Sequence, residues 1–382
     1  MDRITMFYID RFKSLCEFNI PFSTSPDTNF LCLIGKNGAG KSTILQAIDF
    51  AGQIFRGDIS SWLRSRGWER RHLISQKNMR NITLHIEGFF GDKKIVWKSS
   101  FSTTHLKCSN EKIYINDEEV LSLSNDSYSI NKGPAEKNFV KYEGSFLSII
   151  KDSFLQKVEL LDFVNFMKKV YSFDTLNSRQ LRSRARPVGP DGNIGRGGEL
   201  LSGLIASFKQ GEIEKLLNTT KDFYPWIESI YPDTLRGGWK ELYFVESNNG
   251  SFYRNFPSLH ECDGVLRLVG ILSELMTSDT FIVFDEIENG FNPEIMEKLV
   301  HALVQSRKQI IVTTHNPVVL NYIDENVAKD GVLLVYRKNI GNTNIIRFFD
   351  LPEASEKLSY LGPGEVFLDT DINETLKNNG LL

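Results

Sequence analysis

The feature that most restricts the fold of this chain is the segment Gly35–Ser42, which reads GKNGAGKS. It matches the phosphate-binding pattern G-x-x-x-x-G-K-[ST] at every fixed position. An apolar run, Phe30–Ile34, precedes it and predicts a buried strand, while residues 43–48 predict the start of a helix. Strand, loop and helix in this order are the setting that the pattern requires, so the segment predicts a phosphate loop.

The residues of this loop have predicted roles in binding a nucleoside triphosphate. Its glycines let the backbone turn tightly, so that successive N–H groups and the positive end of the helix dipole face phosphate oxygens. Lys41 is predicted to reach the β- and γ-phosphates, and the Ser42 hydroxyl to bind Mg²⁺. The predicted nucleotide-binding residues of the loop are Gly35, Lys36, Asn37, Gly38, Ala39, Gly40, Lys41, Ser42 and Thr43.

The composition is that of a globular protein, with 382 residues, 41% hydrophobic and 24% charged. Since there is no run of about 18 apolar residues and the N-terminal residues are often charged, we expect neither a membrane span nor a secretory signal, and predict a cytoplasmic location. The four cysteines lack C-x-x-C spacing, which argues against a zinc site or a disulfide framework. The net charge of -3 excludes a uniformly basic surface but not a basic patch.

Periodicity outlines the remaining elements. Alternating apolar residues predict an antiparallel pair of strands in 4–22 and a small antiparallel sheet in 82–140. Residues 146–170 are predicted to form one helix that packs on two sides, residues 199–231 to be helical until Tyr231-Pro232, and residues 265–277 to form an amphipathic helix.

Two arginine-rich segments have alternative interpretations. Cations with tryptophans between them, in 56–80, are what a nucleic-acid surface uses, but a solvated face or a protein contact fits equally well. The residues concerned are Arg64, Arg66, Arg70 and Arg71, with Trp62 and Trp68. Arginines in 179–186 precede a glycine-rich segment, 187–198, and indicate a hinge or lid, a phosphate-sensing group, or a plain solvated loop.

Two further apolar runs end in polar side chains: 281–284 precedes Asp285-Glu286, and 310–314 precedes His315. Because ligands bind beyond the carboxyl ends of parallel strands, we expect these groups and Lys41 to meet around one triphosphate. Asp285 is predicted to hold Mg²⁺, Glu286 to polarise the attacking water, and His315 to bond the γ-phosphate. A simple turn and a core histidine are the alternatives. The predicted catalytic residues are Glu286, Asp285, His315 and Lys41, and the predicted metal ligands are Ser42 and Asp285.

Four motifs together resemble the ABC-type ATPases of the SMC and RecF group. They are Phe12-Lys13-Ser14 and the segments 38–43, 284–293 and 313–317. Within that group the chain is similar to stand-alone ATPases of bacterial anti-phage systems of the Septu, PARIS and overcoming-lysogenisation-defect kind. The resemblance implies an α/β P-loop NTPase: an ABC-type head with a mainly parallel sheet core, an antiparallel β subdomain and a helical lid subdomain, without a long coiled coil. The single domain, 1–382, would have an N-terminal lobe at 1–145, a helical or lid insertion at 146–257 and a C-terminal lobe at 258–382.

The resemblance also implies functions for particular segments. Residues 288–293 would be the D-loop that crosses between subunits, and His315 the switch histidine. The signature segment, which binds the γ-phosphate held by the other subunit, would contain Cys262, Asp263 and Gly264; Cys262 replaces the family's usual serine, and a thiol is a weaker donor than a hydroxyl. The family places a glutamine on its metal, for which the candidates are Gln76, Gln156 and Gln180.

The resemblance finally implies an ATP-binding and ATP-hydrolysing switch, with ATP and Mg²⁺ as cofactors, in which two copies of the chain enclose two nucleotides. We expect the ATPase or sensor subunit of a bacterial anti-phage system that controls a separate effector, a nuclease or a toxin, since only a short segment follows His315. Alternatives are a RecF-like DNA-binding repair ATPase and, less in keeping with the unusual signature, the ATPase subunit of an ABC transporter. No membrane contact is expected for the first two.

Overall fold

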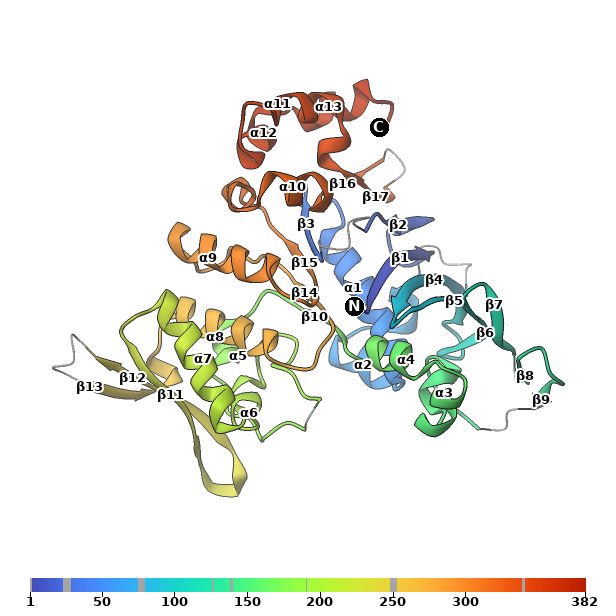
Figure 1. Cartoon of the computed structure of the whole chain (residues 1–382), viewed down its shortest axis with the longest axis horizontal. Helices are drawn as coiled ribbons and strands as arrows, with labels where there is room; N and C mark the ends of the chain where they lie inside the picture. Colours follow the sequence, from blue (N-terminus) through green and yellow to red (C-terminus); the bar gives the residue numbers. More distant parts are fainter. Residues whose placement is uncertain are drawn as a thin grey trace. The chain divides into compact units, whose positions relative to one another are not determined.

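The computed structural model describes residues 2–22, 29–74, 80–125, 127–137, 140–189, 191–247, 253–338 and 341–382. The chain divides into two compact units (Figure 1). The first consists of Met1–Tyr171 and Ile323–Leu382, and the second of Ser172–Tyr322. Both units contain helices and strands, and each contains a parallel pair of strands, which confirms the α/β class with a parallel sheet core.

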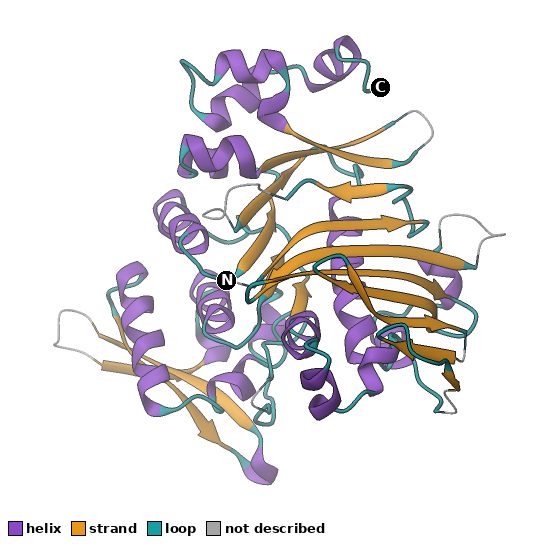
Figure 2. Cartoon of the chain, turned by 45° about the vertical axis from the view of Figure 1, so that its right-hand side comes forward, coloured by secondary structure: helices purple, strands orange, loops and turns teal. Residues whose placement is uncertain are grey.

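An antiparallel sheet dominates the first unit, with strand order β2-β1-β4-β5-β6-β7-β8-β9 (Figure 2). It confirms the predicted strand pair in 4–22 and the predicted sheet in 82–140. Buried and exposed side chains alternate along its long strands, because successive residues of a strand point to opposite faces. Its strands are β1 (Arg3–Asp10), β2 (Phe18–Ile20), β4 (Asn81–Phe90), β5 (Lys93–Ser102), β6 (Lys107–Ile115), β7 (Glu118–Ser124), β8 (Ser127–Ile130) and β9 (Glu136–Lys137).

Three further strands of the first unit carry the phosphate loop and its neighbours. The predicted buried strand before the loop is β3 (Phe30–Ile34), all five residues of which are buried. It pairs in parallel with β16 (Val332–Arg337), and β16 pairs antiparallel with β17 (Thr343–Arg347). Residues more than 300 positions apart in the sequence, such as Ala39 and Thr343, therefore become neighbours.

Helix α1 (Lys41–Arg56) follows the loop and lies against the buried face of the antiparallel sheet. The Phe50 ring packs on Phe12 and Phe101, with ring centroids 5.3 and 5.1 Å apart. One turn further, Phe55 packs on Trp97 at 4.9 Å and on Phe163 of α4 (Leu161–Lys168) at 5.3 Å. Each buried aromatic side chain contributes about 2 to 3 kcal/mol of transfer free energy, so the helix is fixed firmly behind the loop.

Asp49, on α1, binds residues of the basic segment 56–80 that follows the helix. Its buried carboxylate accepts a hydrogen bond from Trp62 Nε1 at 2.6 Å and pairs with Arg66 Nη2 at 2.6 Å and Arg56 Nη2 at 3.4 Å. The Arg66 side chain is only 5% exposed and its guanidinium also lies over the ring of Trp68. Arg66 and Trp62, from the predicted nucleic-acid surface, are thus parts of the core around α2 (Ile59–Ser65).

The prediction of a single helix over 146–170 is wrong. The segment forms a short 3-10 helix at Phe146–Ile149, then α3 (Asp152–Lys157) and α4. Glu159 lies in the left-handed region at φ 59°, and the amide of Leu160 donates back to the carbonyl of Leu155 at 2.8 Å. These are the features of a helix C-terminus, which the apolar periodicity did not reveal.

The C-terminal part of the first unit is mostly helical. Its helices are α10 (Glu325–Gly331), α11 (Pro352–Lys357), α12 (Pro363–Asp369) and α13 (Ile372–Asn378). Within the described ranges the longest helix is α1, with 16 residues, so no long coiled coil exists there, and no helix could cross a bilayer.

The second unit contains the strands with polar ends. The parallel pair is β14 (Phe281–Phe284) and β15 (Gln309–Thr313), joined by α9 (Pro293–Val304), and β10 (Val170–Phe173) precedes the pair in the sheet order. The amphipathic helix predicted for 265–277 is α8 (Asp263–Leu275).

The helical prediction for 199–231 is only partly right. Helices α6 (Leu201–Ile205) and α7 (Gln210–Phe223) follow α5 (Ser178–Leu181). Helix α7 ends at Tyr224-Pro225, earlier than predicted, because the residue before a proline is excluded from the helical region. A three-stranded antiparallel sheet follows, in which Pro232 is tolerated on an edge strand. Its strands are β11 (Ile227–Thr234), β12 (Lys240–Ser247) and β13 (Tyr253–Pro257).

Replacing Asp49 with alanine should destabilise the first unit strongly. The substitution leaves the Arg66 guanidinium buried without its carboxylate, and removing one partner of a buried ion pair costs about 3 to 5 kcal/mol. Urea unfolding followed by tryptophan fluorescence measures the loss. Asp92→Ala, at the exposed turn between β4 and β5, is the matched control and should change stability by less than about 0.5 kcal/mol. Equal stability of the two variants would contradict a central role of Asp49.

Candidate functional site

The phosphate loop has the backbone that its glycines were predicted to allow. Gly35, Gly38 and Gly40 have φ values of 143°, 76° and 115°, in the range that disfavours residues with a Cβ. A Cβ on Gly35 would lie 2.2 Å from the carbonyl oxygen of Val335, and one on Gly40 would lie 2.1 Å from Thr343 Oγ1. Glycine is therefore required at Gly35 and Gly40 for two reasons, the positive φ and the lack of space for a Cβ.

Lys41 and the start of α1 provide the positive charge of the site. The Lys41 ammonium donates to the carbonyls of Gly35, at 2.6 Å, and Lys36, at 3.4 Å, which folds the side chain back over the loop. No side chain caps the N-terminus of α1, and its first turn contains no acidic residue. The amides and dipole of this terminus are therefore available to an anion, and the exposed Ser42 lies in the same turn.

Thr343, at the start of β17, holds the loop from outside. Its hydroxyl donates to the carbonyl of Ala39 at 3.0 Å and lies 2.7 Å from Ser14 Oγ, while its amide donates to the carbonyl of Ser14 at 2.9 Å. Thr343 is nearly fully buried. No local sequence pattern marks Thr343 as a functional residue, because its contacts join segments that are distant in the sequence.

Lys13, in the Phe12-Lys13-Ser14 motif, lies beside the same helix. Its ammonium donates to Gln46 Oε1 at 2.7 Å and lies 3.2 Å from the centroid of the Trp68 ring. Burial, reinforced by the charge of Arg66, lowers the pKa of Lys13 to about 8. The motif thus ties the turn between β1 and β2 to α1 through Lys13 and to β17 through Ser14.

In the second unit, the buried hydroxyl of Thr313 connects the carboxylate of Asp285 with the backbone of Glu286. It donates to Asp285 Oδ1 at 2.5 Å and accepts from the amide of Glu286 at 2.8 Å. The amide of Asp285 donates to the carbonyl of Phe173, at the end of β10, at 3.2 Å. The acidic pair is consequently held by the ends of β10 and β15, the strands on either side of β14. Thr313 is a second residue that the sequence patterns do not reveal.

Glu286 and His315 lie together at these strand ends. Glu286 Oε2 accepts hydrogen bonds from Asn289 Nδ2 at 2.6 Å and Thr175 Oγ1 at 3.2 Å, and Oε1 lies 3.9 Å from His315 Nε2. The Glu286 and His315 side chains are 38% and 36% exposed, so both are accessible to a ligand. The structure thus brings Asp285, Glu286 and His315 together within this unit.

The predicted D-loop, 288–293, leads from this cluster into α9. Glu288 Oε1 accepts from the amide of His315 at 2.7 Å, which fixes the backbone that carries the histidine. Asn292 caps α9 through the amide of Ile295, and Pro293 occupies the first helical turn. Gly290, at φ 81°, makes the intervening turn.

The predicted signature segment forms the N-terminus of α8, with Cys262 at the N-cap position and exposed. Gly264 packs against the D-loop, since a Cβ there would lie 2.9 Å from the carbonyl oxygen of Gly290. Arg182 Nη2 donates to the carbonyl of Glu261 at 2.5 Å and to Asp263 Oδ1 at 2.7 Å. Its guanidinium therefore neutralises Asp263, the acidic residue of the first turn. Among the arginines of 179–186, Arg182 is thus the one that contacts the predicted signature segment.

The contacts of the arginines predicted to bind nucleic acid, and of the glutamines predicted to bind the metal, give these roles less support. Of the four arginines predicted to bind nucleic acid, Arg66 is buried, Arg71 pairs with Glu69 at 2.9 Å, and Arg70 donates to the carbonyl of Thr104. Arg64 is exposed. Among the glutamine candidates, Gln76 lies outside the described residues, Gln156 is exposed on α3, and Gln180 lies beside Gly197. The contacts of Gln156 and Gln180 do not distinguish either as a metal ligand.

The fold and the phosphate loop define the class of this protein as a P-loop NTPase with a mixed α/β core. More narrowly, the chain belongs to the family described as "AAA domain, putative AbiEii toxin, Type IV TA system", whose model matches residues 30–321. The comparison with curated proteins finds no match.

Solved structures of SMC heads share the fold. The crystal structure of the Smc head bound to the C-winged helix domain of ScpA is 15% identical, with a TM-score of 0.54 over 90% of this chain and 96% of that one. The Smc head domain with an extended coiled coil, bound to the C-terminal domain of ScpA derived from Pyrococcus furiosus, is 14% identical, with a TM-score of 0.51 over 94% and 100%. With the family match, this likeness confirms the resemblance to ABC-type ATPases of the SMC group and the SMC-head fold.

Thr343→Val should weaken ATP binding about tenfold. Valine keeps the shape but removes the hydroxyl that braces Ala39 and Ser14, and two neutral hydrogen bonds are worth about 1 to 3 kcal/mol. Fluorescence anisotropy with a labelled ATP analogue measures the affinity. Thr343→Ser keeps the hydroxyl and should bind within about threefold of the unmodified chain, whereas wild-type affinity in the valine variant would show that the brace does not shape the site.

Proposed function

We propose that the protein is an ATP-hydrolysing switch that works as a dimer. In this proposal Lys41 and the loop amides of the first unit, and Asp285, Glu286 and His315 of the second, act on one Mg²⁺-bound ATP. The observation that carries the proposal is the bridge formed by Thr313, which binds the Asp285 carboxylate and the Glu286 amide at a strand end, where the Glu286 carboxylate lies beside a histidine.

The donor set fits ATP and Mg²⁺. The uncapped terminus of α1, without acidic residues, suits phosphate oxygens, and the exposed Ser42 offers a hydroxyl to a metal. Mg²⁺ in nucleotide sites usually takes one or two protein ligands together with phosphates and waters, so Ser42 and Asp285 suffice. When bound, Mg²⁺ neutralises charge on the β- and γ-phosphates.

Glu286 and His315 would carry the chemical step. Glu286 is accessible, and its backbone is fixed by Thr313, so its carboxylate can accept a hydrogen bond from a water in line with the γ-phosphate. His315 lies within reach of the same carboxylate and can donate to a γ-phosphate oxygen, so that loss of this phosphate removes the contact. Lys41, which now donates to loop carbonyls, would exchange these for phosphate oxygens.

The dimer is supported by the signature segment. Cys262 and Gly264 are at the N-terminus of a helix of 13 residues, and Arg182 adds a cation that balances Asp263. A second copy that presented this terminus would add positive charge to the γ-phosphate, and ATP would then hold the two copies together.

For the biological role, we propose the ATPase or sensor subunit of a bacterial anti-phage system that controls a separate effector, a nuclease or a toxin. The family description, which names a putative toxin of a Type IV TA system, supports a place in a two-component system of this general kind. The likeness to SMC heads that were solved with bound ScpA domains supports a partner protein.

Glu286→Gln should trap an ATP-bound dimer, while Lys41→Ala should remain monomeric. The glutamine keeps the shape of Glu286 but accepts a proton from water poorly, so ATP binds and persists; loss of the Lys41 ammonium removes binding. Light scattering with and without ATP should show the mass rising from the 43.7 kDa of one chain toward twice that value only for Glu286→Gln.

Glu294→Gln, on the exposed first turn of α9, is the matched control and should behave like the unmodified chain. A Glu286→Gln protein that binds ATP and stays monomeric would contradict the dimer model. A Lys41→Ala protein that retains ATP affinity would remove the phosphate loop from the mechanism.

Thr313→Val should lower kcat for ATP hydrolysis by about 10- to 100-fold. This is the range typical of residues that hydrogen-bond to a metal ligand and orient it. Binding should change little, since Thr313 is fully buried and acts only through the Asp285 carboxylate and the Glu286 backbone. Phosphate release at saturating ATP gives kcat, and its dependence on ATP concentration gives KM. Thr313→Ser retains the hydroxyl and should lose less than about threefold; equal losses in both variants would indicate a packing effect instead.

A further inference from the structure

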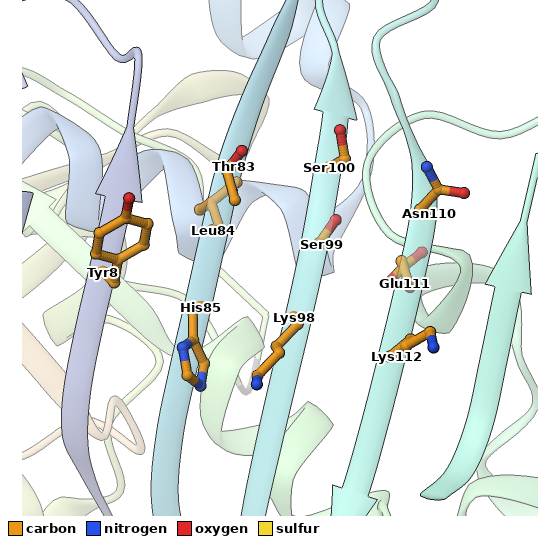
Figure 3. A pocket seen from close by; sticks show the side chains of 10 residues that line it. All are labelled: Tyr8, Thr83, Leu84, His85, Lys98, Ser99, Ser100, Asn110, Glu111 and Lys112. Atoms are coloured by element: carbon orange, nitrogen blue, oxygen red, sulfur yellow. The ribbon is translucent and has the colours of Figure 1, made fainter. Parts of the chain in front are cut away.

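The open face of the antiparallel sheet contains a hollow that the proposed ATPase does not use. Its volume is about 340 Å³, and its walls come from four adjacent strands, β1, β4, β5 and β6 (Figure 3). This volume is at the lower end of the range for small-molecule sites, which is about 300 to 1,000 Å³. Carbon atoms make up most of the lining.

The register of the strands explains which side chains face the hollow. Leu84, Ser99 and Glu111 are buried, so their side chains point to the core and the strands at these positions form the floor. The intervening residues point outward, in two rows across the sheet. The first row is Tyr8, His85, Lys98 and Lys112, and the second is Thr83, Ser100 and Asn110.

The first row places two lysines at directly opposed positions of neighbouring strands. Lys98 lies directly opposite Lys112 on β6 and opposite His85 on β4. Lys112 is 3.6 Å from Glu119, but Lys98 makes no ion pair with any described residue and lies near the ring of Tyr114. Directly opposed like charges destabilise a sheet, and an anion between them would reverse the sign of that interaction.

Neutral donors surround these cations without being used by the fold. The side chains of Tyr8, Thr83, Ser100 and Asn110 have no hydrogen-bond partner within the described part of the chain. Three hydroxyls and an amide therefore line the hollow together with two lysine side chains, of which Lys112 turns its ammonium toward Glu119 (Figure 3). Such a set suits the several oxygens of one phosphate group.

The rim limits the size of the ligand. Asp10 and Glu17 lie near Tyr8, Glu87 pairs with His85 at 2.8 Å, and Glu119 flanks Lys112. A long polyanion would pass these carboxylates, whereas a compact ligand with one phosphate would not. The phenol and imidazole rings of Tyr8 and His85, on neighbouring strands, offer flat faces for a heterocycle.

We propose that this hollow is a second, regulatory nucleotide site, which binds a nucleoside monophosphate. Lys98 and Lys112 hold the phosphate with the help of Ser100 and Asn110, and the base lies against the ring of Tyr8. The hollow adjoins the sheet on whose other face α1 packs, through Trp97 and Phe101 of β5, so a ligand there contacts the element that supports the phosphate loop.

Isothermal titration calorimetry on the full chain carrying Lys41→Ala tests the site without binding at the phosphate loop. AMP, GMP, CMP and UMP are titrated separately, with inorganic phosphate as the reference. We expect at least one nucleotide to bind at one per chain with a Kd below about 1 mM, and at least tenfold tighter than phosphate. Lys98→Glu should weaken that binding at least tenfold, and Tyr8→Leu should weaken binding of the nucleotide but not of phosphate.

The matched control is Lys137→Glu, an exposed lysine on β9 of the same sheet, which should leave the affinity within twofold. Without ligand, Lys98→Gln should raise the thermal midpoint, because it relieves the repulsion from Lys112; a lysine needed for folding would lower it. Absence of binding by all four nucleotides at 1 mM, no effect of Lys98→Glu, or equal affinity for inorganic phosphate would each overturn the proposal. None of these outcomes depends on whether the protein hydrolyses ATP.

Discussion

The phosphate loop depends on how closely its backbone approaches β16 and β17. The approach leaves no room for a Cβ at Gly35, against the Val335 carbonyl, or at Gly40, against Thr343. Glycine alone would leave the loop many conformations, since its freedom is an entropic cost. The contacts with β16 and β17 remove that freedom, and the result is a loop whose amides are directed before any ligand arrives, which is the condition for electrostatic preorganisation.

The same contacts explain what the sequence could and could not reveal. The loop, the strand before it and the helix after it are local features with fixed spacing, so they were predicted correctly. Thr343 and Thr313 carry no local signal, because their hydroxyls act on segments that meet only in the folded chain. The basic segment shows the opposite failure: Arg66 looked like a surface cation by composition, but Asp49 draws it into the core.

The errors in helix prediction have a common physical origin. Apolar periodicity reports which side chains are buried, and it continues through a break if the chain stays against the same core. Between α3 and α4 the break is a left-handed Glu159, a residue type that gives no warning of it. After α7 the break is Tyr224-Pro225. The sequence contained this signal, but the helix end was predicted at Tyr231-Pro232, seven positions later. Backbone constraints therefore locate ends that burial patterns cannot.

Among the proposed catalytic residues, Glu286 is the one with an unfavourable backbone conformation. Its φ of 51° lies in the left-handed region, which costs a residue with a side chain about 1 kcal/mol or more. The structure compensates with a hydrogen bond from its amide to Thr313, and Asn289 and Thr175 then hold its carboxylate. With these contacts the carboxylate lies 3.9 Å from His315 and its side chain is more than a third exposed, which is the position that the proposed hydrolysis requires.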